Sequence, residues 1–103
     1  MNSKLRITAL QIPLFWEDAD KNRDYIENHL NVIDKDTDII LLPEMFTTGF
    51  TMNAKQVAES MEGASLILMK SWAKKLEVLL GGSLVIKEDG KLYNRFVIVD
   101  FNG

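Results

Sequence analysis

The sequence contains no cysteine, and only one histidine, two prolines and six glycines occur among its 103 residues. Without cysteine the chain forms neither disulfides nor zinc–thiolate sites. It also has no thiol of its own that could act as a nucleophile.

Excess positive charge and long apolar runs are also missing. Twelve Lys and Arg stand against fifteen Asp and Glu, a formal net charge of -3, so no electrostatic footprint of a nucleic-acid-binding protein is present. No apolar run approaches the roughly 20 residues that span a bilayer, and segment 1–13 lacks the long apolar region of a secretory signal. We expect a globular cytoplasmic protein with neither nucleic-acid nor membrane partners.

The hydrophobic pattern predicts an α/β domain with the order β-α-β-loop-α-β-β. The short apolar run 39–42 is bounded by Asp38 and Pro43, which is typical of a central strand covered on both faces. Glu88-Asp89-Gly90 predicts a hairpin turn between the last two strands. Four strands should form one mostly buried sheet with helices near 18–33 and 64–76 packed against it. The predicted strands lie near 4–12, 38–42, 78–87 and 94–101.

The segment 44–63 has no steady period and predicts a long loop with one helical turn. Long irregular loops are uncommon in compact domains unless they are functional. Further along, Gly81-Gly82 interrupts the third predicted strand, which indicates a bulge or a close approach of another part of the chain. The single histidine, His29, falls at the edge of its helix's apolar stripe and is interpreted as a half-solvated boundary residue.

Glu44 is the main candidate for chemistry because it follows the buried strand 38–42 directly. Ligands of open α/β sheets bind beyond the carboxyl ends of the strands. Partial burial there would disfavour the charged carboxylate and suit it to proton transfer. We therefore expect Glu44 to face a concavity near the end of strand 78–87 and to be less exposed than Glu59 and Glu62. The alternative is a surface glutamate that caps the strand or pairs with a lysine.

Four segments of the chain together resemble the nitrilase-type carbon–nitrogen hydrolases. The segment 38–46, Asp-Ile-Ile-Leu-Leu-Pro-Glu-Met-Phe, followed by Thr-Thr-Gly-Phe, is similar to the first motif of that family. Segments 5–11, 81–83 and 93–100 resemble its first strand, its glycine-bearing strand and the strand that leads to its catalytic lysine. The form Leu-Pro-Glu-Met-Phe-Thr-Thr-Gly-Phe is most similar to the ω-amidase-like branch.

This resemblance implies the N-terminal part of a nitrilase-like α-β-β-α sandwich and an amidase that needs no cofactor or metal. In the family a Glu, a Lys and a Cys act together, and the resemblance maps the Glu, as general base, onto Glu44. Phe46 and Phe50 would wall the substrate pocket, or alternatively anchor the loop in the core. The implied substrate is a small amide, such as an ω-amide of a dicarboxylic or 2-oxo acid, and the complete enzyme would be a homo-oligomer.

The sequence departs from the family pattern because residues 1–103 contain neither the lysine beyond strand 94–101 nor the cysteine. Lys91 lies in the hairpin turn before that strand and does not match. We therefore expect residues 1–103 to be the N-terminal portion of a single truncated carbon–nitrogen hydrolase domain, inactive alone.

Two alternatives remain open at the level of sequence. The first is a metal-dependent phosphodiesterase or phosphatase of the endonuclease/exonuclease type, which also places a Glu after its second strand. Pro43 stands where that family usually has Gln, and Gln11-Ile12-Pro13 stands where its first strand ends at a metal-binding Asn. The second alternative is a non-catalytic α/β binding module.

Overall fold

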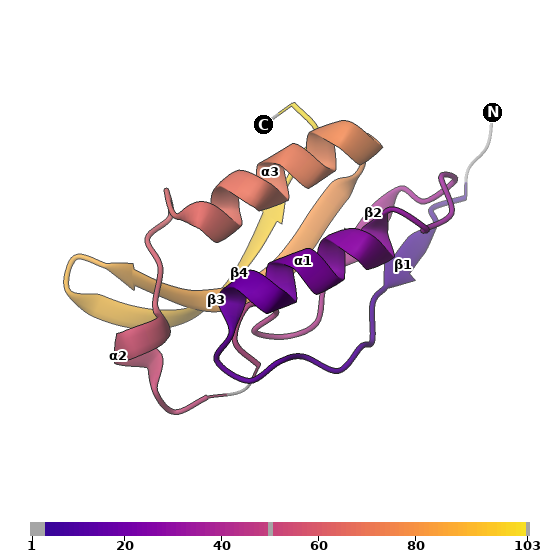
Figure 1. Cartoon of the computed structure of the whole chain (residues 1–103). Coiled ribbons are helices and arrows are strands. Elements are labelled where there is room, and N and C mark those ends of the chain that lie inside the picture. The colour runs from indigo at the N-terminus through magenta and orange to yellow at the C-terminus, as the bar shows by residue number, and fades with distance from the viewer. Residues whose placement is uncertain (1–3, 50, 103) are drawn as a thin grey trace.

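The computed structural model describes residues 4–49 and 51–102, which form one four-stranded sheet with two long helices (Figure 1). The α/β class and the predicted order of elements are confirmed. The loop after the second strand contains the expected helical turn. In chain order the elements are β1 (Ile7–Ala9), α1 (Ala19–Leu30), β2 (Ile39–Leu41), α2 (Ala54–Val57), α3 (Ala64–Leu76), β3 (Leu79–Glu88) and β4 (Lys91–Val99).

The strands lie in the sheet in chain order. β1, β2 and β3 are parallel, and β4 folds back antiparallel on β3. The return is made at Asp89 and Gly90, whose φ angles of 51° and 76° are those of a two-residue hairpin turn. The predicted hairpin is therefore confirmed, and so is the prediction that the first two strands share one sheet.

β1 is shorter than the predicted strand 4–12, and β2 limits its length. β2 has three residues, and Pro43 follows it closely with no amide to donate to a ladder. The last bonds at this end run from the Leu10 amide to the Leu41 carbonyl, 2.9 Å, and from the Leu42 amide to the Gly81 carbonyl, 2.7 Å. β3 continues to Glu88 because β4 pairs with it over that length.

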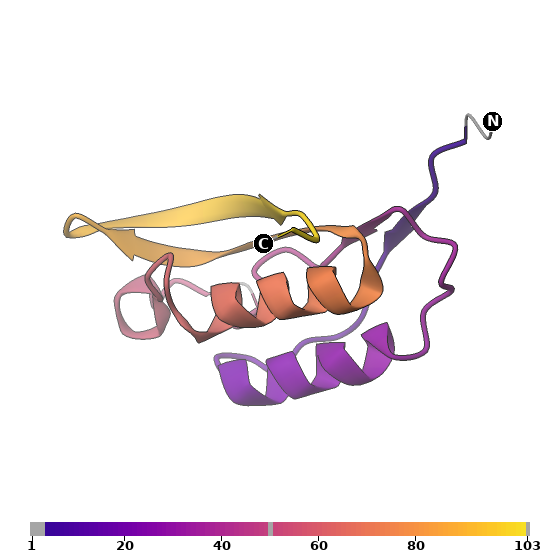
Figure 2. The same cartoon turned by 90° about the horizontal axis from the view of Figure 1, so that it is seen from above.

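Both long helices lie on the same side of the sheet, as Figure 2 shows. α1 begins after Asp18, whose carboxylate accepts a hydrogen bond from the Lys21 amide at 3.2 Å. Among the described residues no helix is long and apolar enough to cross a membrane. The core between helices and sheet is built from large apolar side chains, chiefly Ile26, Leu30, Leu66, Met69, Trp72, Ile40, Leu80, Leu84 and Ile86.

The opposite side of the sheet, here called the open face, is not covered by any described helix. The expectation that strand 38–42 is buried on both faces is therefore wrong: Ile40 is fully buried, whereas its neighbours Ile39 and Leu41 are half-buried. Apolar side chains of the outer strands are more exposed still. On the open face Ile7 is 56% exposed, Phe96 57% and Ile98 61%.

Where β2 ends, the following loop continues along the same edge of β3. The Phe46 amide donates to the Ser83 carbonyl at 3.1 Å, and the Glu59 amide donates to the Val85 carbonyl at 3.0 Å. Glu59 also accepts from the Lys87 amide at 2.8 Å, which makes a one-residue parallel bridge with Ile86. The loop 44–63 is therefore attached to the sheet at both ends.

Candidate functional site

Glu44 lies two residues after Leu42, at the carboxyl end of β2. Beside it runs the middle of β3, since β3 extends well past the point where β2 stops. Glu44 was predicted to lie near the end of strand 78–87, but it lies beside Ser83, in the middle of β3. The carboxyl end of a parallel strand is the expected ligand-binding edge of an α/β sheet.

The Glu44 side chain lines a concavity of about 380 Å³ that opens on the open face. No hydrogen bond or ion pair joins its carboxylate to another residue in the described ranges, so it is available to a ligand. The neighbouring polar groups are the Ser83 hydroxyl and the Asn94 amide, with the ring of Phe96 beside them. The complete lining is Leu41, Leu42, Glu44, Ser83, Asn94 and Phe96.

The exposure of Glu44 differs from the prediction. Glu44 is exposed, whereas the Glu59 side chain is only 17% exposed, so the expectation that Glu44 is the more buried of the two is wrong. The physical reason is that Glu44 faces the uncovered side of the sheet. Glu59 is instead enclosed between α1 and the start of α3. The Glu44 side chain therefore lacks the partial burial that was expected of it.

The turn that carries Glu44 is tightly bonded. Met45 adopts a left-handed backbone conformation, with φ of 49°, and its carbonyl accepts from the amides of Thr48 at 3.1 Å and Gly49 at 2.8 Å. Its own amide donates to the Ser83 hydroxyl at 2.8 Å. Met45 and Phe46 are both buried. These contacts fix the direction in which the chain leaves β2.

Asn22 of α1 holds the same loop from the helix side. It is completely buried, and its side-chain amide donates to the carbonyls of Phe15 at 2.6 Å and Thr47 at 2.7 Å. Its side-chain oxygen accepts from the Phe15 amide at 2.7 Å. Asn22 was not identified from the sequence. The feature of the sequence that could have identified it is its place on the apolar stripe of a helix, four residues before Ile26.

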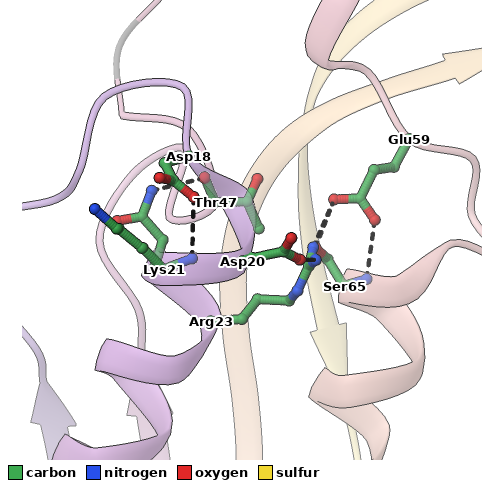
Figure 3. Close-up of polar contacts among 8 residues, drawn as sticks. Asp18, Asp20, Lys21, Arg23, Thr47, Glu59 and Ser65 are labelled. Carbon is green, nitrogen blue, oxygen red and sulfur yellow. Dashed lines mark hydrogen bonds and ion pairs between the residues drawn. The ribbon is translucent and has the colours of Figure 1, made fainter.

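A second cavity, of about 490 Å³, lies beside a polar cluster that joins α1 to α3 (Figure 3). Arg23 donates to the Ser65 hydroxyl at 3.0 Å and lies 3.5 Å from the Glu59 carboxylate. Glu59 accepts from the amide and hydroxyl of Ser65, at 2.9 and 2.6 Å. Glu59 thereby caps α3, whose N-cap residue Gly63 has no side chain to do so. The groups of this cluster satisfy one another, which indicates a structural role.

The two aromatic candidates are placed differently. Phe46 is fully buried in the core and lies outside the concavity beside Glu44, so its burial favours the alternative of a loop anchor. Phe50 lies outside the described residues. His29 is half-buried, and its Nδ1 lies 2.9 Å from the Tyr25 carbonyl, in agreement with a boundary residue.

Comparison with known proteins identifies the family to which the chain belongs. The model of the carbon-nitrogen hydrolase family matches residues 6–103, and the chain belongs to that family. Within it the chain falls in the ω-amidase-like branch. It is 39% identical over 101 residues to omega-amidase YafV of Yersinia enterocolitica, a match that covers 98% of this chain and 39% of the relative.

Two further comparisons agree. The chain is 28% identical over 102 residues to 2-oxoglutaramate amidase of Bacillus subtilis, covering 97% of this chain and 39% of the relative. Among solved structures it is similar to XC1258 of Xanthomonas campestris, a CN-hydrolase superfamily protein, with a TM-score of 0.90 and 31% identity over 95% of this chain and 37% of that one. The resemblance seen in the sequence is confirmed. The chain spans about two fifths of the length of the relatives it matches.

Proposed function

We propose that this chain supplies the glutamate-bearing part of an amidase that hydrolyses small ω-amides to an acid and ammonia. The observation that carries the proposal is the position of Glu44. It stands at the family's Leu-Pro-Glu motif, and its carboxylate is unpaired among the described residues and faces a concavity at the carboxyl end of a parallel strand.

In the proposed reaction Glu44 acts as general base. It takes the proton of a cysteine thiol, and the resulting thiolate attacks the amide carbon. A lysine stabilises the oxyanion that develops on the former carbonyl oxygen. Glu44 returns the proton to the amide nitrogen, which leaves as ammonia. Water then hydrolyses the thioester to release the acid. The resemblance places the lysine and the cysteine outside residues 1–103, so Glu44 performs the one step that these residues can supply.

The proposed substrates are amides of small dicarboxylic or 2-oxo acids. Two kinds of relative support this class, because the names omega-amidase and 2-oxoglutaramate amidase both denote hydrolysis of such amides. The concavity of about 380 Å³ has room for a molecule of this size beside Glu44. Its polar groups, Ser83 and Asn94, can donate hydrogen bonds to carbonyl or carboxylate oxygens.

Fragment complementation tests the proposal with the chain as it exists. The chain is mixed with omega-amidase YafV of Escherichia coli from which the matching N-terminal part, 38% of that protein, has been deleted. Ammonia release from a small ω-amide is then measured. Activity should appear, and Glu44→Gln should lower it by roughly 10²–10⁴-fold, the usual contribution of general acid–base catalysis.

Two controls make the result decisive. Glu62→Gln changes an exposed loop carboxylate in the same way and should leave the activity unchanged. The N-terminal part of YafV itself, added to the same remainder, shows whether the fragments can reassemble. The proposal would be contradicted if the two YafV fragments together are active while the YafV remainder mixed with this chain is inactive. Full activity of the mixture with the Glu44→Gln chain would also contradict it.

A further inference from the structure

We infer that Ser83 is a positioning residue for Glu44, acting through the backbone amide of Met45. This inference deepens the proposed function, because it names a residue of β3 that would orient the general base. The Met45 amide, one residue after Glu44, donates to the Ser83 hydroxyl at 2.8 Å, and this contact is buried. The next amide, of Phe46, donates to the Ser83 carbonyl at 3.1 Å.

The turn at Met45 needs such support. A left-handed conformation is unfavourable for a residue with a β-carbon and persists where surrounding contacts hold it. Met45 has φ of 49° and is 5% exposed, and the hydrogen bond from its amide to Ser83 is buried. The Ser83 side chain supplies that acceptor. If it is removed, the bond that holds the chain directly after Glu44 is lost.

Ser83 also faces the concavity that Glu44 lines. Its oxygen accepts from Met45, and its hydroxyl proton is not donated to any residue in the described ranges. One serine therefore fixes the backbone directly after Glu44 and presents a hydroxyl donor to the concavity that the Glu44 side chain also lines. A serine of purely structural importance would satisfy the first condition without the second.

The two hydrogen bonds at Ser83 can be separated by mutation. Ser83→Ala removes the acceptor for Met45 but keeps the carbonyl that binds the Phe46 amide. Ser83→Thr keeps the hydroxyl and suits a strand. Ser83→Cys keeps the volume but offers a weaker acceptor. Ser65→Ala is the matched control, since it deletes another buried serine hydroxyl that does not contact the turn.

Hydrogen exchange of methionine amides provides the readout. The chain is labelled with ¹⁵N-methionine, so that Met45 reports on the turn and the buried Met69 of α3 reports on the core in one spectrum. Ser83→Ala should lower the protection of Met45 by roughly ten- to hundredfold relative to Met69, because a buried amide has lost its acceptor. Ser83→Thr should restore the protection of the Met45 amide. Ser65→Ala should leave the protection of Met45 unchanged relative to that of Met69.

If Ser83→Ala lowers the protection of the Met45 and Met69 amides equally, Ser83 has a general stabilising role and the inference is overturned. Unchanged protection of Met45 would overturn it too. If Ser83→Ala does not fold, Ser83→Cys is measured instead. We expect it to lower the protection of Met45 alone, and an equal loss of protection at Met45 and Met69 would contradict the inference. None of these measurements needs enzymatic activity. Failure of the complementation assay would therefore count against the proposed function while the exchange data still judge Ser83.

Discussion

The indole N–H of Trp72 donates a hydrogen bond to the carboxylate of Glu27 at 3.0 Å and so joins α3 to α1. Trp72 is 3% exposed whereas Glu27 is half-buried, so the bond joins a core side chain to one at the edge of the core. Two helices that are far apart in the sequence are thereby fixed at a defined point along their lengths.

Trp72→Phe should lower the free energy of unfolding by about 1–3 kcal/mol, because it removes a hydrogen bond to a charged group and leaves space in the core. Glu27→Gln keeps an oxygen acceptor and should cost less. Urea unfolding followed by circular dichroism measures both, with no dependence on the tryptophan signal. Equal stability of Trp72→Phe and the wild type would argue that the contact contributes nothing.

Asn22→Ala should be among the most damaging single substitutions, at about 3 kcal/mol or more of unfolding free energy. It deletes three hydrogen bonds, and it leaves the buried Thr47 carbonyl and the part-buried Phe15 amide without these partners. Asn28→Ala, on the exposed side of the same helix, should stay within about 0.5 kcal/mol. The same urea experiment compares them, and similar midpoints would refute the assigned role of Asn22.

The two adjacent glycines of β3 should respond differently to alanine. At Gly82 a β-carbon would lie 3.0 Å from the buried Phe46 ring and 3.1 Å from Leu42. At Gly81 it would meet the tip of Phe96, which is 57% exposed and can turn away. Gly82→Ala should therefore cost about 1–3 kcal/mol, as overpacked cores do. Gly81→Ala should cost less, and a reversed order of urea midpoints would contradict this account.

The open face should cause the chain to self-associate, because contiguous exposed apolar surface favours contact with other molecules. Replacing both Phe96 and Ile98 with threonine should shift sedimentation toward the monomer, while keeping residues that suit a strand. Ile67→Thr changes a side chain that is 63% exposed on α3 and should have little effect. An unchanged distribution in the double variant would locate the association elsewhere.

The 103-residue chain alone should release no ammonia from small ω-amides. General-base help is worth about 10²–10⁴-fold only where a nucleophile is positioned to use it, and the chain has no cysteine. Steady ammonia release by the purified chain, lost on Glu44→Gln, would overturn both this prediction and the cysteine mechanism.

Local patterns predicted α3 and the hairpin turn of the second half of the fold, but β4 covers Lys91–Val99 and not the predicted 94–101, so Lys91 is a strand residue and not part of the turn. α3 begins and ends where its apolar spacing predicts, at 64–76, and Asp89-Gly90 makes the hairpin because both positions require positive φ. β1 could not be bounded in this way. Its apolar residues continue to Ile12, but an edge strand extends only as far as its neighbour, and β2 is short.

The neighbourhood of Glu44 was predictable only in part. Its place after a parallel strand followed from the run 38–42 and Pro43. The exposure of the Glu44 side chain could not be predicted, because it depends on what covers the open face of the sheet, and no local sequence pattern encodes that. The contacts of Asn22 with Thr47 and of Arg23 with Ser65 were also missed, since they join residues 25 and 42 positions apart through side chains of ordinary polarity.

The one-residue bridge at Glu59 bears on how copies of the chain could aggregate. Along the edge that β2 leaves free, the carbonyls of Gly81, Ser83 and Val85 already accept amides from Leu42, Phe46 and Glu59. A foreign strand finds no vacant hydrogen-bonding row there. Intermolecular β-sheet extension, the route toward amyloid-like growth, would have to begin at the outer edge of β1 or β4.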